Sequence, residues 1–91
     1  MSQVSRTVLI ANRRGLHARA SAKFVTLASA QPVEVAVAKE GAGEVTGTSI
    51  MGLMMLGAAM GDHITISAAG DGADSAVGAL CELVEAKFGE D

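Results

Sequence analysis

The stretch Asn12-Arg13-Arg14-Gly15-Leu16-His17-Ala18-Arg19-Ala20 decides how this chain folds, because it joins two segments of opposite character. The residues before it, Thr7-Val8-Leu9-Ile10-Ala11, are apolar and β-branched, which predicts a strand over residues 4–11. The residues after it carry apolar side chains at helical spacing, which predicts a helix over residues 18–30. We therefore expect His17 at the point where a strand has ended and a helix begins.

A histidine at the start of a helix is well placed to carry a negatively charged group. The first N–H groups of a helix have no partner inside it and carry the positive end of its dipole, so they bind anions. His17 is a candidate acceptor of a phosphoryl group, whose charge Arg19 and the backbone N–H groups of Ala18 and Arg19 would hold. Because a carrier must also release its cargo, we expect a shallow, exposed site.

Two structural alternatives stand beside this interpretation. His17 would merely cap the helix, or would be an ordinary surface histidine, since a histidine becomes functional only through its surroundings. Arg13 and Arg14 would be no more than a solvated turn.

The next part of the chain predicts a hairpin and a short helix. Alternating valines predict a second strand over residues 33–38, and a glycine-rich turn joins it to a short third strand over residues 44–47. Thr48 or Ser49 caps a helix over residues 50–56, and Gly57 ends it.

The last part of the chain predicts a fourth strand over residues 63–68 and a helix over residues 73–88, capped by Asp71 or Asp74. The inward stripe of this helix is Ala76, Val77, Leu80, Leu83 or Val84, and Phe88. The order β-α-β-β-α-β-α predicts an α+β fold of two layers, with helices on one face of an antiparallel sheet.

The composition excludes several classes of protein. A length of 91 residues predicts a single domain over residues 1–91. A net charge of −3 and an aromatic content of 2% argue against a nucleic-acid partner. We expect no membrane association, because no run of residues could span a bilayer and no signal peptide is recognisable.

The few histidines and the single cysteine also limit the chemistry. Cys81 cannot form an internal disulfide, which fits the cytoplasm, and we expect it in the core. His63 is expected to face solvent from its strand. His17, His63 and Cys81 lack the spacing of metal ligands, so we expect no metal.

The helix over residues 50–56 is rich in methionine. Ile50, Met51, Met54 and Met55 cannot all face inward on two turns, whereas Leu53 and Leu56 belong to the core. We favour an exposed patch of methionines beside His17, because methionine suits surfaces that fit several partners. The alternative is that these methionines also fill the core.

Two motifs resemble those of a known family. Gly15-Leu16-His17-Ala18-Arg19 is similar to the phosphorylation-site signature of the histidine-containing phosphocarrier protein, HPr, of the phosphoenolpyruvate-dependent phosphotransferase system. The segment from Thr48 to Gly57, TSIMGLMMLG, is similar to the regulatory-serine signature of that family. The element order and the length agree over essentially the whole chain, which is expected to be a single HPr-like domain.

The resemblance implies a fold and a role for each motif. It implies an open-faced sandwich with sheet order 1-4-2-3 and three helices on one face. It implies that His17 is phosphorylated on Nδ1 with the assistance of Arg19, and that Ser49 is the site of a regulatory kinase, HPr serine kinase/phosphorylase. For Ser49, helix capping alone is the structural alternative.

As an HPr-like protein, the chain would be a phosphoryl carrier and not an enzyme, acting in sugar uptake or in nitrogen-related regulation. It would accept the phosphoryl group from enzyme I and pass it to an EIIA-type domain, as a monomer and without a cofactor. The expected docking surface comprises Leu16, Ile50, Met51, Met54 and Met55.

The chain departs from the family pattern in two places. Ala20 follows Arg19 where the family often has proline, which preorganises a first turn but is not essential there. Arg13 stands two residues before the glycine, where members of the sugar system often have proline or an asparagine-like residue. The methionine-rich helix, in turn, is similar to that of the nitrogen-related branch of the system. These features bear on the branch more than on the chemistry.

Two rival functions come from other classes. The first is an acylphosphatase-like hydrolase, which would need an anion-binding loop with its own arginine and an amide side chain that positions water. Only Asn12 and the nearby arginines offer this. The second is a non-catalytic regulatory module that binds partners through the methionine-rich helix, but it leaves His17 and Arg19 unexplained.

Overall fold

The computed structural model describes residues 3–90 and contains the predicted elements in the predicted order. The strands are β1 (Gln3–Leu9), β2 (Val35–Lys39), β3 (Gly43–Thr46) and β4 (His63–Ala69). The helices are α1 (Ala18–Ser29), α2 (Ile50–Met55) and α3 (Ala73–Glu85), and a short turn, η1 (Lys87–Gly89), follows α3.

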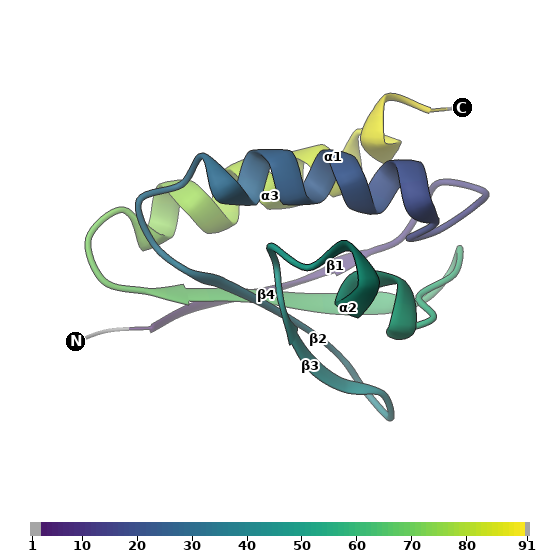
Figure 1. Cartoon of the computed structure of the whole chain (residues 1–91), viewed down its shortest axis with the longest axis horizontal. Helices are drawn as coiled ribbons and strands as arrows, with labels where there is room; N and C mark the ends of the chain where they lie inside the picture. The colour runs from purple at the N-terminus through teal and green to yellow at the C-terminus, as the bar shows by residue number, and fades with distance from the viewer. Residues whose placement is uncertain (1–2, 91) are drawn as a thin grey trace.

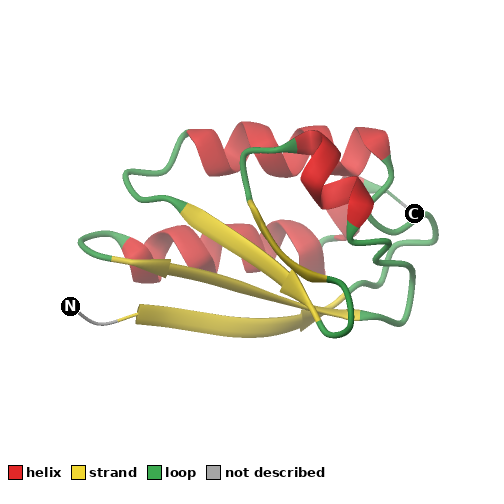
Figure 2. Ribbon diagram, turned by 60° about the horizontal axis from the view of Figure 1, so that its bottom comes forward, coloured by secondary structure: helices red, strands yellow, loops and turns green. Residues whose placement is uncertain are grey.

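The strands form one antiparallel sheet in the order β1-β4-β2-β3, so β4 is inserted between the first two strands of the chain. Helices α1 and α3 lie together over one face of this sheet, and α2 packs beside α1 near β3 (Figure 1). The opposite face, turned toward the reader in Figure 2, has no helix across it in the described part of the chain. The predicted α+β open-faced sandwich with sheet order 1-4-2-3 is confirmed.

The core lies between the sheet and the two long helices, and both periodicities of the sequence point into it. In β2 and β4 every second residue is buried (Val35, Val37, Ile64, Ile66 and Ala68), as period 2 requires, although Ser67 between two of them is buried as well. Helices α1 and α3 bury one stripe each. The largest buried side chains in this layer are Ile10, Val37, Ile64, Ile66, Phe24, Val77, Leu80 and Val84. The prediction left open whether Leu83 or Val84 belongs to the inward stripe of α3. Val84 is buried, and Leu83 is only partly buried at the margin of the core.

The caps of α2 follow the prediction, and the cap of α3 does not. The hydroxyl of Ser49 accepts a hydrogen bond from the N–H of Gly52, and Gly57 ends the helix with a φ of +65°. Helix α3 instead begins after Gly72, whose φ is 90°, and no side chain caps it. The predicted cap by Asp71 or Asp74 is therefore wrong. The left-handed backbone of Gly72 turns the chain into the helix. Asp74 lies in the first turn, where its negative charge interacts favourably with the positive end of the helix dipole.

The end of the chain also differs from the prediction of one helix through Phe88. Helix α3 stops at Glu85, and the backbone enters the left-handed region at Lys87 and Phe88, with φ of 59° and 55°. Such values cost a residue with a side chain about 1–2 kcal/mol. Phe88 is nonetheless buried in the core, and burying a large apolar side chain is worth about 1.5–3 kcal/mol. With two such residues the turn costs about 2–4 kcal/mol, most of which the burial of Phe88 offsets.

Candidate functional site

The loop that precedes α1 is held by backbone hydrogen bonds to the loop that precedes β4. The N–H of Ile10 donates to Asp62 O at 2.8 Å, and that of Gly61 donates to Ile10 O at 2.9 Å. The N–H of Leu16 donates to Ala58 O at 3.0 Å. The residues just before His17 therefore have a defined position, although they lie outside regular secondary structure.

His17 occupies the N-cap position of α1, with extended backbone angles, but its ring makes no capping hydrogen bond. Its carbonyl oxygen accepts from the N–H of Ser21 at 2.9 Å, and the buried hydroxyl of Ser21 donates to Leu16 O at 3.1 Å. The helix start is therefore organised by backbone and Ser21, and the imidazole does not occupy the first N–H groups. The alternative that the His17 side chain serves to cap α1 is excluded.

The carboxylate of Glu90 covers one nitrogen of the ring. Nε2 of His17 lies 2.6 Å from Oε2 of Glu90, and the two side chains are 15% and 18% exposed. The expectation of an exposed site is thus corrected in part, because His17 lies at the surface but Glu90 shields the Nε2 side of its ring. The shielding comes from a residue 73 positions away in the sequence.

Asn12 holds the other oxygen of Glu90. Its Nδ2 donates to Oε1 of Glu90 at 3.1 Å and to the carbonyl oxygen of Gly15 at 2.9 Å. Asn12 is fully buried, and within residues 3–90 its Oδ1 has no hydrogen-bond partner. A buried amide therefore connects the loop before α1 to the carboxylate beside His17.

The environment of Glu90 favours its ionised form. Partial desolvation raises the pKa of the Glu90 carboxyl, but the hydrogen bonds from His17 and Asn12 and the charges of His17 and Lys23 lower it more. The net pKa lies below the ordinary value of a glutamate. Glu90 therefore faces His17 as a carboxylate at neutral pH.

Three features of the chain end bring Glu90 to this position. Phe88 is anchored in the core, and the positive φ of Lys87, Phe88 and Gly89 folds the chain back over the start of α1. The ammonium group of Lys23 on α1 donates to the carbonyl oxygen of Phe88 at 2.7 Å. The end of the chain and the start of α1 accordingly lie on the same side of the molecule (Figure 1).

Three arginines share a surface hollow with Glu90. Arg13, Arg14, Arg19 and Glu90 line an open hollow of about 260 Å³. Guanidinium groups stay charged and bind phosphate oxygens with two donors at once. The three arginines outweigh the single carboxylate in a chain whose net charge is −3. The hollow is therefore suited to an anion, and Arg13 and Arg14 contribute to it as well as the predicted Arg19.

The methionine-rich helix presents an apolar surface, as predicted. Met51 and Met55 are 71% and 78% exposed, and Ile50 and Met54 are exposed as well. Leu53 and Leu56 are buried, as expected for the core side of α2. We call Ile50, Met51, Met54 and Met55 the α2 patch.

Leu16 was predicted to belong to the docking surface, and the structure corrects this. Its side chain is 5% exposed and lies in the core. The hydrogen bond from its N–H to Ala58 turns the residue inward, so its side chain is not available to a partner.

The remaining candidate residues lie as expected. Ser49 is half-buried at the start of α2, His63 is exposed at the start of β4, and Cys81 is buried with a free thiol. Among residues 3–90, no three His, Cys, Asp or Glu side chains come together as ligands of a metal ion. Within the same range, no helix is long and apolar enough to cross a membrane.

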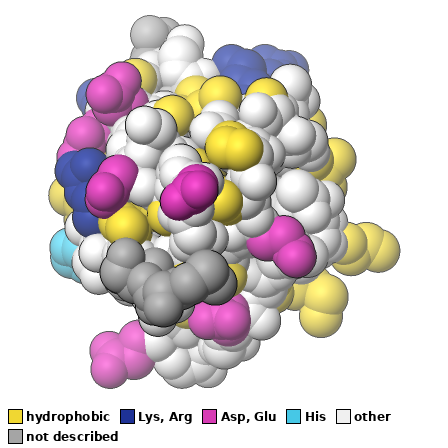
Figure 3. All heavy atoms as spheres, turned by 90° about the vertical axis from the view of Figure 1, so that its left-hand side faces the viewer, with side chains coloured by type: hydrophobic (Ala, Val, Ile, Leu, Met, Phe, Trp, Pro, Cys, Tyr) yellow, Lys and Arg dark blue, Asp and Glu magenta, His cyan; other side chains and the backbone are white. Residues whose placement is uncertain are grey.

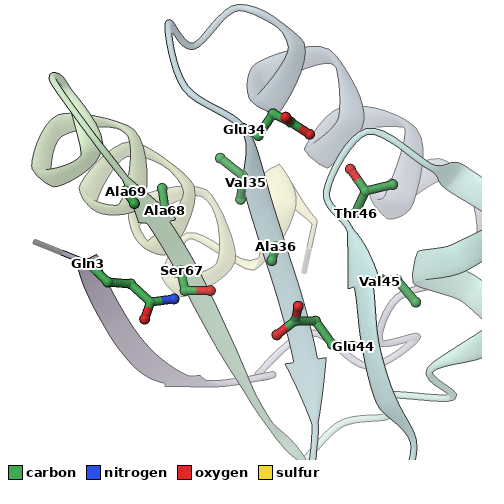
Figure 4. Close-up of a pocket in the computed structure, with 10 residues that line it drawn as sticks. All are labelled: Gln3, Glu34, Val35, Ala36, Glu44, Val45, Thr46, Ser67, Ala68 and Ala69. Carbon is green, nitrogen blue, oxygen red and sulfur yellow. The ribbon is translucent and has the colours of Figure 1, made fainter. Parts of the chain in front are cut away.

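Other hollows of the surface have a different character. A depression of about 390 Å³ runs along β2, β3 and β4, with the carboxylates of Glu34 and Glu44 on its walls (Figure 4). The end of the molecule shown in Figure 3 lies opposite the end with the start of α1 and carries acidic side chains dispersed among basic, apolar and uncharged ones. The depression is lined by carboxylates and does not suit an anion, whereas the hollow beside Glu90 is lined by three arginines.

Sequence reasoning missed Glu90 and Lys23, and considered Asn12 only for the rival hydrolase. No local signal marks them, because Glu90 and Lys23 reach the site through the fold of the chain end. Asn12 lies within the decisive stretch, and a polar amide directly after an apolar strand is the one signal that could have drawn attention to it.

Comparison with known proteins gives consistent matches over the whole chain. A family model described as "PTS HPr component phosphorylation site" matches residues 4–86. The phosphocarrier protein NPr of Shewanella violacea is 42% identical over 90 residues, covering 99% of this chain and 98% of that protein. The phosphocarrier protein HPr of Neisseria meningitidis serogroup B is 47% identical over 89 residues, covering 96% and 97%. The crystal structure of HPr-C-His from Thermoanaerobacter tengcongensis matches with a TM-score of 0.88 at 43% identity, covering 100% of this chain and 99% of that one.

Proposed function

Because the chain belongs to the HPr family of phosphocarrier proteins of the phosphotransferase system, we propose that it carries its phosphoryl group on His17. A member of this family is a carrier that works with the enzymes of the system and is not itself an enzyme. In our proposal, enzyme I donates the phosphoryl group to His17, and an EIIA-type domain receives it. The exchange takes place in the cytoplasm.

The observation that supports this most directly is the position of the His17 ring. The ring stands at the start of α1 without capping it, and the Glu90 carboxylate that it contacts also lines the arginine hollow. The first N–H groups of the helix, among them those of Ala18 and Arg19, and the Arg19 guanidinium would stabilise a dianionic group on the ring. The open hollow lets the group leave again, as a carrier requires.

The transfer needs a neutral ring with one nitrogen unprotonated. In our proposal the lone pair of Nδ1 attacks phosphorus, an N–P bond forms, and the bond to the donor's leaving atom breaks with its electron pair. The negative charge of the phosphoryl oxygens then faces Arg19 and the helix start, where fixed positive charge is already in place. Delivery to an acceptor is the reverse of these steps.

Mass spectrometry after incubation with phosphoenolpyruvate and enzyme I tests the proposal. We expect a gain of one phosphate that is lost in acid, and no gain in His17→Ala. The chain offers a matched control in its other histidine, the exposed His63, so His63→Ala should accept phosphate normally. Acid-labile phosphate on the His17→Ala protein would refute the assignment of His17.

We propose the α2 patch as the docking surface for enzyme I and the EIIA-type domain. Four exposed apolar side chains on one short helix exceed the scattered apolar residues of an ordinary surface. Titration of the ¹⁵N-labelled protein with an EIIA-type domain should shift the amide signals of α2 and the start of α1. Shifts confined to α3 would count against the patch.

The same patch supports the second candidate, a binding module that acts without phosphoryl transfer. Phosphoryl transfer separates the two, because replacing Met51 and Met55 by glutamate should weaken docking in either case but slow transfer only in a carrier. A protein that binds its partner through the patch but never accepts phosphate would favour the binding module.

We further propose that phosphorylation of Ser49 by a serine kinase regulates docking. The Ser49 hydroxyl lies beside the α2 patch and caps α2 by accepting from Gly52 N–H at 2.9 Å. A phosphate there is compatible with the helix start and adds about two negative charges to the docking surface. Ser49→Asp should therefore slow transfer with little change in fold.

Ser49→Asn is the matched control, because asparagine caps a helix as well as serine does but carries no charge. Normal transfer by Ser49→Asp would remove the regulatory role and leave capping as the function of Ser49. Whether the carrier serves sugar uptake or nitrogen-related regulation depends on which EIIA-type domains accept its phosphate.

A further inference from the structure

We propose that Glu90 is a positioning residue that holds His17 as the Nε2–H tautomer and so keeps the lone pair on Nδ1. The consequence for transfer rests on the proposed function, whereas the tautomer itself follows from the contacts of the ring. Glu90 contacts the ring at Nε2, whereas the phosphoryl group would be bonded to Nδ1. Glu90 acts through His17, and Asn12 acts through Glu90.

The first step of the argument is the contact between the two side chains. A carboxylate can only accept hydrogen bonds, and it lies 2.6 Å from Nε2 of His17. The hydrogen between them must therefore be carried by Nε2. In a neutral imidazole one nitrogen carries the hydrogen and the other the lone pair, so Nδ1 is left as the nucleophile.

The second step is the orientation of the carboxylate. Asn12 donates from Nδ2 to both Glu90 Oε1 and the Gly15 carbonyl, and these two acceptors use both hydrogens of the amide. The orientation of the Asn12 amide is thereby determined, because its oxygen could not donate to either partner. Each oxygen of Glu90 consequently has its own partner, Asn12 for Oε1 and His17 for Oε2.

The third step is the charge balance of the transfer. When Nδ1 uses its lone pair to form the N–P bond, the donor's leaving atom keeps the pair of the broken bond. The ring, still protonated on Nε2, becomes cationic, and the Glu90 carboxylate faces that charge. No proton has to move in either direction, since the pair returns to Nδ1 when the N–P bond breaks.

This arrangement predicts different effects for two substitutions of Glu90. In Glu90→Gln, Asn12 would hold the introduced amide by its oxygen, so the NH₂ group would face the ring. The ring would have to accept at Nε2, which moves its hydrogen to Nδ1 and blocks the nucleophile. In Glu90→Ala, the ring would relax to its own mixture of tautomers.

The test measures the ring and the transfer separately. Long-range ¹H–¹⁵N spectra of the ring at alkaline pH should show His17 protonated on Nε2 in the natural protein, on Nδ1 in Glu90→Gln, and on both in Glu90→Ala. The rate of phosphorylation by enzyme I should fall about tenfold in Glu90→Ala, the size expected for one charge-assisted hydrogen bond. It should fall further in Glu90→Gln.

The order of the variants decides the proposal. If Glu90 merely tied the chain end to the domain, Glu90→Gln would resemble the natural protein and Glu90→Ala would be the slower variant, which would overturn it. A ring protonated on Nδ1 in the natural protein would overturn it as well. If the spectra follow the expected pattern but no protein accepts phosphate on His17, the tautomer assignment stands and the proposed function fails.

Discussion

Gly15 lies so close to Ala58 that a Cβ atom added to it would be 2.3 Å from the carbonyl oxygen of Ala58. That oxygen also accepts the hydrogen bond from Leu16 N–H, the next residue along the chain. The backbone of Gly15 has a φ of +61°, which side chains disfavour. The two loops that place His17 can therefore approach each other only because residue 15 is glycine.

Gly15→Ala should destabilise the protein severely. The left-handed backbone alone costs a non-glycine residue about 1–3 kcal/mol. The contact with a backbone oxygen must be relieved in addition, so we expect a loss of about 3 kcal/mol or more in the free energy of unfolding. Urea denaturation measures this loss.

Gly41→Ala is the matched control for Gly15→Ala. Gly41 has a φ of +85°, but an added Cβ would meet no atom within 4 Å. It should lose only about 1 kcal/mol, from backbone strain. Equal losses in the two variants would show that the contact with Ala58 is unimportant.

Phe88→Ala should loosen the turn that places Glu90 beside His17, as well as the core. Removing a buried phenylalanine typically costs about 3–5 kcal/mol, and here it also removes the anchor of the turn that carries Glu90. Phe88→Leu keeps most of the volume and should lose less. Unfolding measurements give the stabilities, and the ring spectra of His17 report whether Glu90 has left. An unchanged ring environment in Phe88→Ala would show that Lys23 holds the turn unaided.

The contribution of Glu90 to stability should disappear in acid. Because its folded pKa is lowered, the contribution is fully present above the ordinary glutamate pKa of about 4.3 and is lost as the pH falls through the lower folded value. The difference in unfolding free energy between the natural protein and Glu90→Ala should therefore be constant near pH 5 and shrink below pH 4. A difference that grows in acid would contradict the lowered pKa.

Cys81 should resist alkylation in the folded protein. Burial raises the pKa of its thiol, the charge of Arg6 lowers it, and that of Glu85 raises it further, with a net increase. The side chain is fully buried, and only the exposed thiolate reacts readily. Iodoacetamide should modify the protein in denaturant and leave it unmodified in buffer. Fast modification in buffer would mean that α3 opens locally.

Much of the fold could be predicted from neighbouring residues. The alternation of Val35 and Val37 and the spacing of Ala76, Val77 and Leu80 determine which faces are buried, because strands repeat every two residues and helices every 3.6. The cap of α2 by Ser49 is likewise a contact within one helical turn. The expected position of His17 at the start of α1 followed from the same local patterns.

The surroundings of His17 could not be predicted in this way. The burial of Leu16 depends on Ala58, and the shielding of the ring depends on Glu90. The left-handed turn at Lys87 and Phe88 contradicts the helical pattern of the sequence and arises because Phe88 fills a place in the core.

The sequence by itself thus determined the order of the elements, the buried faces and the histidine at a helix start, since each depends on residues within a few positions of one another. Only the tertiary structure decided which groups meet that histidine. Glu90 and Asn12 are distant in sequence, and the packing of the whole core sets the path of the chain that brings them together.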